Sequence, residues 1–131
     1  MAISVSDRRV IERTTPVYSA RFVDEFGNPV ALANLVTVVL TLYNLVDGVI
    51  INGRDKQDIK NANDVTIHAT TGDIIWSLQE ADTVLVNPDQ IPVGNLEAHI
   101  ALFEWSYGPG GARKGKHLVQ IDIIQTTKVP T

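Results

Sequence analysis

The longest run of alternating hydrophobic and polar positions lies near the end of the chain. Residues 96–107 and 115–125 both alternate with a period of two, which is the repeat of a β-strand. The seven residues between them include three glycines and a proline, which favour a turn and cannot continue either strand. The sequence therefore predicts a long hairpin.

Shorter alternating runs precede this hairpin and are bounded by turn residues such as Asp47-Gly48. They predict strands at 17–24, 37–46, 65–70, 74–79 and 84–86. Residues 37–46 are apolar on both faces, which predicts a place at the centre of a sheet. Trp76 shares its face with Ile74 and Leu78, so it is the best candidate for the centre of the core.

The remaining segments contain few apolar residues. Residues 53–64 are predicted to be a surface loop with a short strand around Ile59, and residues 79–83 a single helical turn. Seven or eight short strands with regularly spaced turns indicate an all-β, antiparallel β-sandwich. Residues 17–125 should form this domain, between an N-terminal arm (1–16) and a C-terminal arm (126–131).

Length and composition are those of a globular protein. The 131 residues fit one domain, and 44% hydrophobic with 20% charged residues argues against extensive disorder. The chain has no cysteine, so disulfides and thiolate metal sites are excluded, and a reducing compartment fits. The most apolar run, 35–46, is too short and polar to span a membrane, and the start does not resemble a signal peptide. These features predict a soluble protein.

The net charge of −4 is unevenly distributed. Residues 1–16 carry three basic and two acidic side chains, residues 17–112 four and twelve, and residues 113–131 four and one. Basic ends on an acidic body can guide contacts between neighbouring copies, or they can simply keep the tails solvated. The acidic body argues against a nucleic-acid partner, because phosphate binding requires a concentrated basic face.

The motifs of common catalytic and metal sites are missing. There is no cysteine nucleophile and no Gly-x-Ser-x-Gly motif. His68, His99 and His117 fall on three different predicted strands, and their spacing does not favour a metal site. Glu97 and Glu104 are seven residues apart and should lie on opposite faces of one strand. We therefore expect no catalytic residues, no metal and no cofactor.

Two groups of residues are candidates for partner binding. The basic group lies in the N-terminal arm and at the hairpin tip, and comprises Arg8, Arg9, Arg13, Arg113, Lys114 and Lys116. The aromatic group, Trp105 and Tyr107, shares the face of Phe103 near the tip. Exposed, these aromatic rings could stack on a sugar or anchor a protein; packed inward, the interpretation we prefer, they belong to the core.

Several short motifs occur in a characteristic order along the chain. They are Asp24-x-x-Gly-x-Pro-Val30, Val39-Leu-Thr-Leu-Tyr43, Gly72-Asp-Ile-Ile-Trp76, Asp82-Thr83 and Gly94-Asn-Leu-Glu-Ala-His99. Their order and spacing over residues 17–125 resemble the immunoglobulin-like domains of tailed-bacteriophage virion proteins, in particular the N-terminal domains of baseplate upper proteins. The resemblance implies an immunoglobulin-like sandwich that acts as a structural part of a virion.

The same resemblance implies partners and a location. The protein would be made in the host cytoplasm, would assemble into the virion as a symmetric homo-oligomer, and would contact other virion proteins, without catalytic activity. No stalk or receptor-binding region follows residue 125, so we expect a small component of the neck, collar, tail, baseplate or head surface. The alternative is a carbohydrate-binding module that uses Trp105 and Tyr107.

Overall fold

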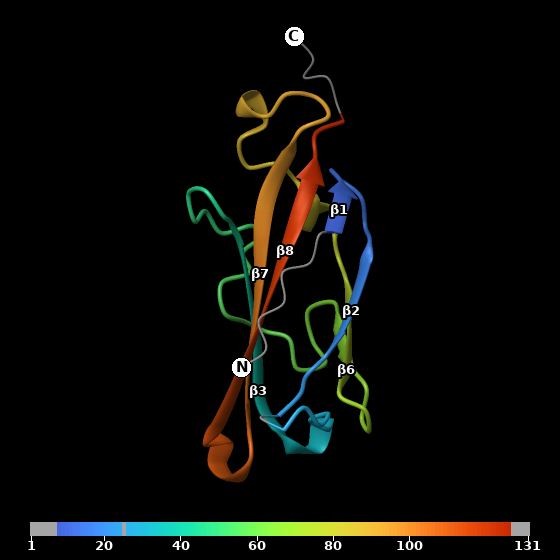
Figure 1. The fold of residues 1–131 in the computed structure, drawn as a ribbon, viewed down its shortest axis with the longest axis vertical. Helices are drawn as coiled ribbons and strands as arrows, with labels where there is room; N and C mark the ends of the chain where they lie inside the picture. Colours follow the sequence, from blue (N-terminus) through green and yellow to red (C-terminus); the bar gives the residue numbers. More distant parts are fainter. Residues whose placement is uncertain (1–7, 25, 127–131) are drawn as a thin grey trace.

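In a computed structural model, which describes residues 8–24 and 26–126, the chain forms a β-sandwich of two sheets (Figure 1). The strands are β1 (Arg8–Ile11), β2 (Val17–Arg21), β3 (Leu35–Asn44), β4 (Gln57–Asp58), β5 (Val65–Ile67), β6 (Asp73–Ser77), β7 (Leu96–Tyr107) and β8 (Arg113–Ile124). Short 3-10 turns are η1 (Leu32–Asn34), η2 (Glu80–Thr83), η3 (Pro88–Gln90) and η4 (Pro109–Gly111). None of the helices in this part of the chain is long and apolar enough to cross a membrane.

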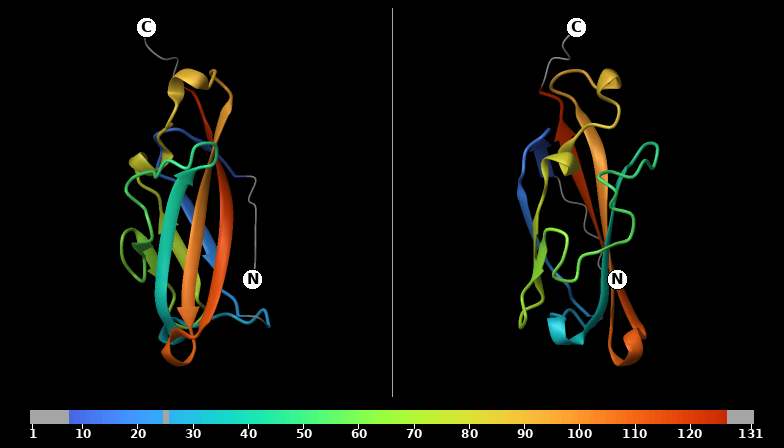
Figure 2. Two further views of the ribbon diagram at one scale, coloured as in Figure 1. Left: turned by 90° about the vertical axis from the view of Figure 1, so that its left-hand side faces the viewer. Right: turned by 180° about the vertical axis from the view of Figure 1, so that it is seen from behind.

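The strands divide into a five-stranded and a three-stranded sheet, and the right view of Figure 2 shows the two sheets edge-on. The larger sheet has the order β1-β8-β7-β3-β4 and the smaller one β2-β6-β5. Neighbouring strands are antiparallel, except that β1 runs parallel to β8. The all-β sandwich predicted from the alternating pattern is confirmed.

The predicted hairpin is the longest element of the fold. β7 has the predicted bounds, while β8 begins two residues earlier and ends one residue earlier than expected. The strands pair without a register shift from Leu96 with Ile124 to Tyr107 with Arg113. At the turn, Gly108 and Gly110 have φ values of 76° and 63°, in the left-handed region that glycine adopts most easily.

β3 is an interior strand of the larger sheet, between β7 and β4, as its apolar faces predicted, although the middle one of the five strands is β7. β3 pairs with β7 on one side, but on its other side β4 contributes only two residues. The irregular segment before and after β4 supplies further backbone hydrogen bonds, from Ile51 N to Leu42 O and from Ile59 N to Val38 O. An apolar strand is therefore protected by a loop instead of a second long strand.

The core lies between the inward faces that the alternation predicted. Trp76 is fully buried, as expected for its central position, and its ring meets that of Phe103 edge-on with centroids 5.9 Å apart. Phe22 stacks on Trp105 at 4.3 Å. The strand pattern of Tyr18, Ala20 and Phe22, alternating with exposed residues, likewise points into this core.

Other predicted segments differ from the structure. Arg8–Ile11 is a strand of the larger sheet and not part of an arm, because it pairs with β8. Glu12 is buried and accepts a hydrogen bond from Thr126 N, which ties both ends of the domain together. Residues 84–86 are not a strand. Of the predicted arms, residues 1–7 and 127–131 lie outside the described part of the chain.

Candidate functional site

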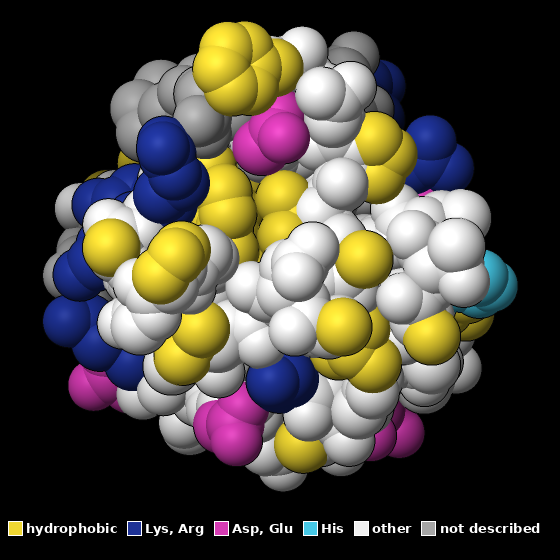
Figure 3. All heavy atoms as spheres, turned by 90° about the horizontal axis from the view of Figure 1, so that it is seen from below, with side chains coloured by type: hydrophobic (Ala, Val, Ile, Leu, Met, Phe, Trp, Pro, Cys, Tyr) yellow, Lys and Arg dark blue, Asp and Glu magenta, His cyan; other side chains and the backbone are white. Residues whose placement is uncertain are grey.

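The η4 turn, the loop residues 24 and 26–31, and η1 meet at one end of the sandwich, which we call the lower end from its place in Figure 1. They enclose an open hollow of about 330 Å³. Its described lining residues are Asp24, Phe26, Pro29, Val30, Asn34, Tyr107, Gly108 and Arg113. Seen from below, hydrophobic side chains gather in and around a hollow, with lysine and arginine side chains along one flank (Figure 3).

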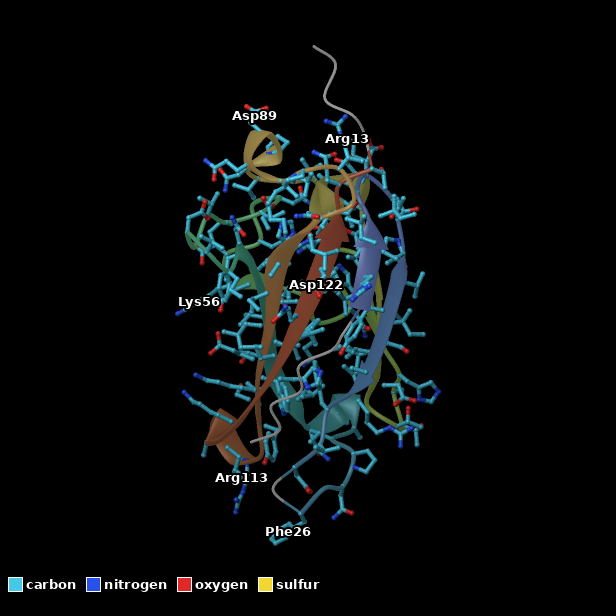
Figure 4. The ribbon with its side chains drawn as sticks, turned by 45° about the horizontal axis from the view of Figure 1, so that its top comes forward. Arg13, Phe26, Lys56, Asp89, Arg113 and Asp122 are labelled. Atoms are coloured by element: carbon cyan, nitrogen blue, oxygen red, sulfur yellow. The ribbon has the colours of Figure 1, made fainter. Side chains whose placement is uncertain are left out.

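A tight turn presents Phe26 at the lower end. The Asp24 carboxylate accepts hydrogen bonds from the backbone N–H groups of Phe26 and Asn28, both at 2.9 Å. Gly27 follows with a φ of 80°, a turn conformation that glycine adopts more easily than other residues. Asp24 thus forms the turn, as its sequence context predicts. The Phe26 side chain is 79% exposed and points away from the body (Figure 4).

A second open hollow, of about 400 Å³, lies between the η4 turn and β3. Its described lining residues are Val36, Thr37, Val39, Lys56, Glu104, Trp105, Ser106, Gly110, Gly111 and Lys114. The Thr37 and Ser106 hydroxyl oxygens are 2.6 Å apart, and Ser106 also accepts a hydrogen bond from Thr37 N. These hydroxyl groups hold β3 against β7, so the lining combines structural contacts with exposed cationic side chains.

The cations of the hairpin tip are close together, as predicted. Arg113, Lys114 and Lys116 lie at the beginning of strand β8, and all three are exposed. Lys116 Nζ lies 3.6 Å from a carboxylate oxygen of Glu104 on β7, a solvent-exposed pair of small energetic weight. A basic rim therefore stands beside the apolar hollow, and the arrangement suits the binding of a partner surface.

The basic residues of the N-terminal segment lie elsewhere. Arg9 is an exposed residue of β1, and for Arg8 the structure defines only the position in that strand. Arg13 is exposed and its backbone N–H donates to Thr83 O at 3.2 Å. Figure 4 shows Arg13 at the opposite end of the molecule from Arg113. The predicted basic group is therefore divided between the two ends.

The aromatic pair points inward. Trp105 is 4% and Tyr107 9% exposed, and Trp105 stacks on Phe22 between the sheets. Inward packing was the preferred interpretation and is confirmed. An exposed platform for a sugar is not formed by these two side chains. Phe26, which the sequence placed in a turn, is the exposed aromatic residue near the tip.

The three histidines make separate contacts. His99 is buried on β7, with Nε2 2.6 Å from Glu97 Oε1. His117 on β8 lies 2.9 Å from the Tyr18 hydroxyl, and His68 forms part of the turn before β6. Within residues 8–24 and 26–126, no three His, Asp or Glu side chains are arranged to hold a metal ion. Burial lowers the pKa of His99 despite Glu97, and burial also lowers the pKa of His117.

Glu97 fixes the loop that follows η2. Its two carboxylate oxygens accept hydrogen bonds from Val86 N at 2.7 Å and Asn87 N at 2.9 Å. Glu97 is buried, whereas Glu104 is partly exposed, so the two carboxylates lie on opposite faces of β7 as the spacing predicts. They do not form a catalytic pair.

A buried arginine in the loop 53–64 was not predicted from the sequence. Arg54 is 1% exposed and binds the buried Asp82 carboxylate through Nε at 2.6 Å and Nη2 at 2.9 Å. It also contacts Asp64 and lies 5.5 Å from the centre of the Trp76 ring. Burial lowers the pKa of Arg54, but the two aspartates together raise it, so the side chain stays charged.

This Arg54 cluster changes the interpretation of the loop. Ile59 in the same segment is also fully buried, so the predicted surface loop is anchored in the core at two positions. Asp82 in addition accepts a hydrogen bond from Gln79 N, which closes the η2 turn. The cluster joins the loop to η2 and its charges are paired within it. We therefore interpret it as a structural cluster and not as a ligand site.

Comparison with known proteins adds no assignment to this geometry. The sequence matches no known protein-family profile, and no curated protein is similar to it at a significant level.

Proposed function

We propose that the protein is a non-enzymatic structural component of a tailed-bacteriophage virion, which docks on other virion proteins and on copies of itself. The observation that carries the proposal is the lower end, where Phe26 is 79% exposed beside a hollow and a row of cations. The virion setting comes from the resemblance over residues 17–125. The neck, collar, tail, baseplate and head surface all remain candidate positions.

The chemistry of the lower end supports docking. A large exposed aromatic side chain next to a concave apolar surface is the kind of anchor that protein interfaces use. The cations Arg113, Lys114 and Lys116 suit an acidic partner and would guide its approach. The middle of this chain is itself acidic, with four basic and twelve acidic residues over 17–112, so another copy is one suitable partner.

The distribution of buried charges supports the same proposal. Arg54 is paired with Asp82, and Glu97 holds two backbone N–H groups and His99. These groups stabilise loops and are not directed into either hollow. A rigid sandwich whose buried charged groups are paired or hydrogen-bonded in this way is well suited to hold a docking surface in a fixed shape.

The arms are a weaker candidate for docking than the sequence indicated. Arg8 and Arg9 belong to β1, so removing residues 1–13 would remove a strand of the sheet. A deletion of residues 1–7 is the appropriate test of the arm alone. We expect the shortened protein to fold and to retain the lower end.

Particle incorporation tests the proposal. We expect Phe26→Ser to keep the midpoint of urea unfolding but to lower the number of copies per purified particle at least about tenfold, as for a lost interface anchor. Val46→Ser is the matched control, because Val46 is 86% exposed on the loop after β3, away from the lower end. Copies are counted by quantitative mass spectrometry.

Two outcomes would contradict the proposal at different levels. Absence of the protein from purified particles would reject the structural role. Normal incorporation of the Phe26→Ser variant, with the protein present in particles, would keep that role and reject the lower end as the docking surface.

A further inference from the structure

In the described part of the chain, another strand covers the outer edge of β8 over a third of its length. β1 pairs with residues Ile121 to Ile124 of β8. From Arg113 to Gln120, β8 pairs with β7 on its other side, and within the described ranges no strand pairs with this outer edge. Such an edge presents backbone groups that can accept a further strand.

The direction of these backbone groups follows from the alternation of hydrogen bonds. Leu45 N donates to Ala98 O at 3.0 Å, so the even-numbered residues of β7 bond to β3 and the odd-numbered ones to β8. In the β7–β8 register, odd-numbered residues pair with odd-numbered residues. The even-numbered residues of β8 therefore face the outer edge, consistent with the hydrogen bond from Glu12 N to Ile124 O.

Four even-numbered residues that precede the pairing with β1 face this edge: Gln120, which adjoins that pairing, and the three farther from it, Lys114, Lys116 and Leu118. Their N–H and C=O groups point along the sheet to the outside, and their side chains lie on the outer face of the sheet. Both lysines are exposed and Leu118 is half-buried. On the same face, Lys116 Nζ lies 3.6 Å from a carboxylate oxygen of Glu104, an exposed pair of small energetic weight, while the Asp122 carboxylate farther along β8 is buried and accepts a hydrogen bond from Gln120 Nε2.

We propose that this edge binds an extended acidic segment of a partner protein, which adds to the sheet as a further strand. Backbone hydrogen bonds would be made to Lys114, Lys116 and Leu118. Side chains two residues apart on the added strand lie beside successive outward residues of β8. The segment therefore carries carboxylates at two alternate positions, next to the lysines, and an apolar residue at the third, next to Leu118.

Charge selects this occupant over two others. The same edge of a second copy would place lysine beside lysine, and lysines on an edge strand commonly prevent such pairing. The chain's own residues 1–7 contain one carboxylate, Asp7, so they cannot supply a carboxylate for each of the two lysines. An acidic strand from another protein can place a carboxylate beside the positive charge of each of the two lysines.

This inference rests on the proposed function, because assembly into a virion is where the protein would meet such a partner. It adds the outer edge of β8 to the lower end as a second contact surface, one that binds acidic segments. Its test uses the purified full chain and two synthetic peptides, so it does not depend on particles. The probe is Ser-Glu-Thr-Glu-Thr-Val-Thr, and the control is Ser-Lys-Thr-Lys-Thr-Val-Thr. Amide hydrogen exchange is followed by NMR at each β8 residue.

We expect the glutamate peptide to slow exchange of the Lys114, Lys116 and Leu118 amides at least about fivefold at saturating concentration. The lysine peptide should have no effect. The double variant Lys114→Glu with Lys116→Glu should reverse this preference. Lys116→Pro removes an N–H group that faces the outer edge and not β7, so the hydrogen bonds between β7 and β8 are kept. In this variant the glutamate peptide should no longer slow exchange, because the peptide loses a hydrogen-bond donor at the edge.

The inference would be overturned by equal slowing with both peptides, or by slowing with neither. It would also be overturned if the three amides are protected without peptide and lose this protection when residues 1–7 are deleted. Failure with normal particle incorporation would reject the inference alone, whereas peptide binding by a protein absent from particles would reject only the proposed virion role.

Discussion

The loop 52–64 and the hairpin turn 108–112 both require residues with positive φ, but they place different residue types there. Both contain positions with φ in the left-handed region. In the hairpin turn, the described positions of this kind are glycines, which adopt such φ values at little cost. In the loop, they include the non-glycine residues Asn52, Lys56, Asn61, Asn63 and Asp64, with φ between 49° and 75°. Each of these has an energetic cost, smallest for Asn and Asp.

The Arg54 cluster accounts for this difference. Arg54 donates to Asn63 O at 3.1 Å and to Asp64, and Asn52 donates to Asp82 at 2.9 Å, so three of the left-handed residues are held by the cluster. The hairpin turn has no comparable set of buried bonds in the described structure, and its cations remain at the surface. The loop 52–64 therefore contributes buried side chains to the core, whereas the hairpin turn 108–112 keeps its cations at the surface, where a partner can bind them.

The largest expected effect comes from breaking the Arg54 cluster. Arg54→Met leaves Asp82 buried without its cation, which should lower the free energy of unfolding by about 3–5 kcal/mol. Lys114→Met, at the exposed tip, is the matched control and should change it by less than about 0.5 kcal/mol. Urea unfolding followed by tryptophan fluorescence measures both. Equal effects would remove the distinction between the two loops.

The boundary between turn and core is tested at two glycines. A Cβ on Gly115 would lie 2.3 Å from the Trp105 ring, so Gly115→Ala should destabilise by about 3 kcal/mol through overpacking. On Gly110 a Cβ meets nothing within 4 Å, and only the φ of 63° opposes alanine, at about 1 kcal/mol. Thermal unfolding of both variants gives the ranking, and the reverse order would contradict the packing around Trp105.

Acidification should act on the histidines of the sandwich and leave the tip unaffected. The folded-state pKa values of His99 and His117 are lowered, so the unfolded chain takes up protons first as the pH falls below the ordinary value of 6.5. Stability is thus full above that pH and decreases below it, by at most about 1.4 kcal/mol per histidine and pH unit. Urea unfolding at pH 7.5 and 5.5 should show a smaller loss for His117→Gln than for the unaltered chain.

The smallest effect on stability is expected at the tip itself. Lys116 and Glu104 form an exposed pair at 3.6 Å, and Lys116→Ser should change the free energy of unfolding by less than about 0.5 kcal/mol. The same substitution should weaken binding of the acidic peptide. A change in the free energy of unfolding above about 1 kcal/mol would show that Lys116 stabilises the fold and is not a residue of the contact surface alone.

Period-two alternation predicted most of the sandwich because burial of one face requires it. The inward residues of β2, β6 and β7, among them Trp76 and Phe103, follow from this pattern alone. The turn positions of Gly27, Gly48 and Gly108 were likewise predictable, since each has a positive φ. The short strand near Ile59 was placed within two residues of β4.

The tertiary structure decided which polar residues are inside and which strands are neighbours. A charged residue in a polar segment carries no local sign of burial, because its partner, here Asp82 for Arg54, is 28 residues away in the sequence. The parallel pairing of β1 with β8 joins residues more than a hundred positions apart, and among the residues that the structure describes no strand pairs with the outer edge of β8 at Lys114, Lys116 and Leu118. Sequence periodicity specifies the face of a strand, whereas its neighbours depend on long-range packing that no local pattern encodes.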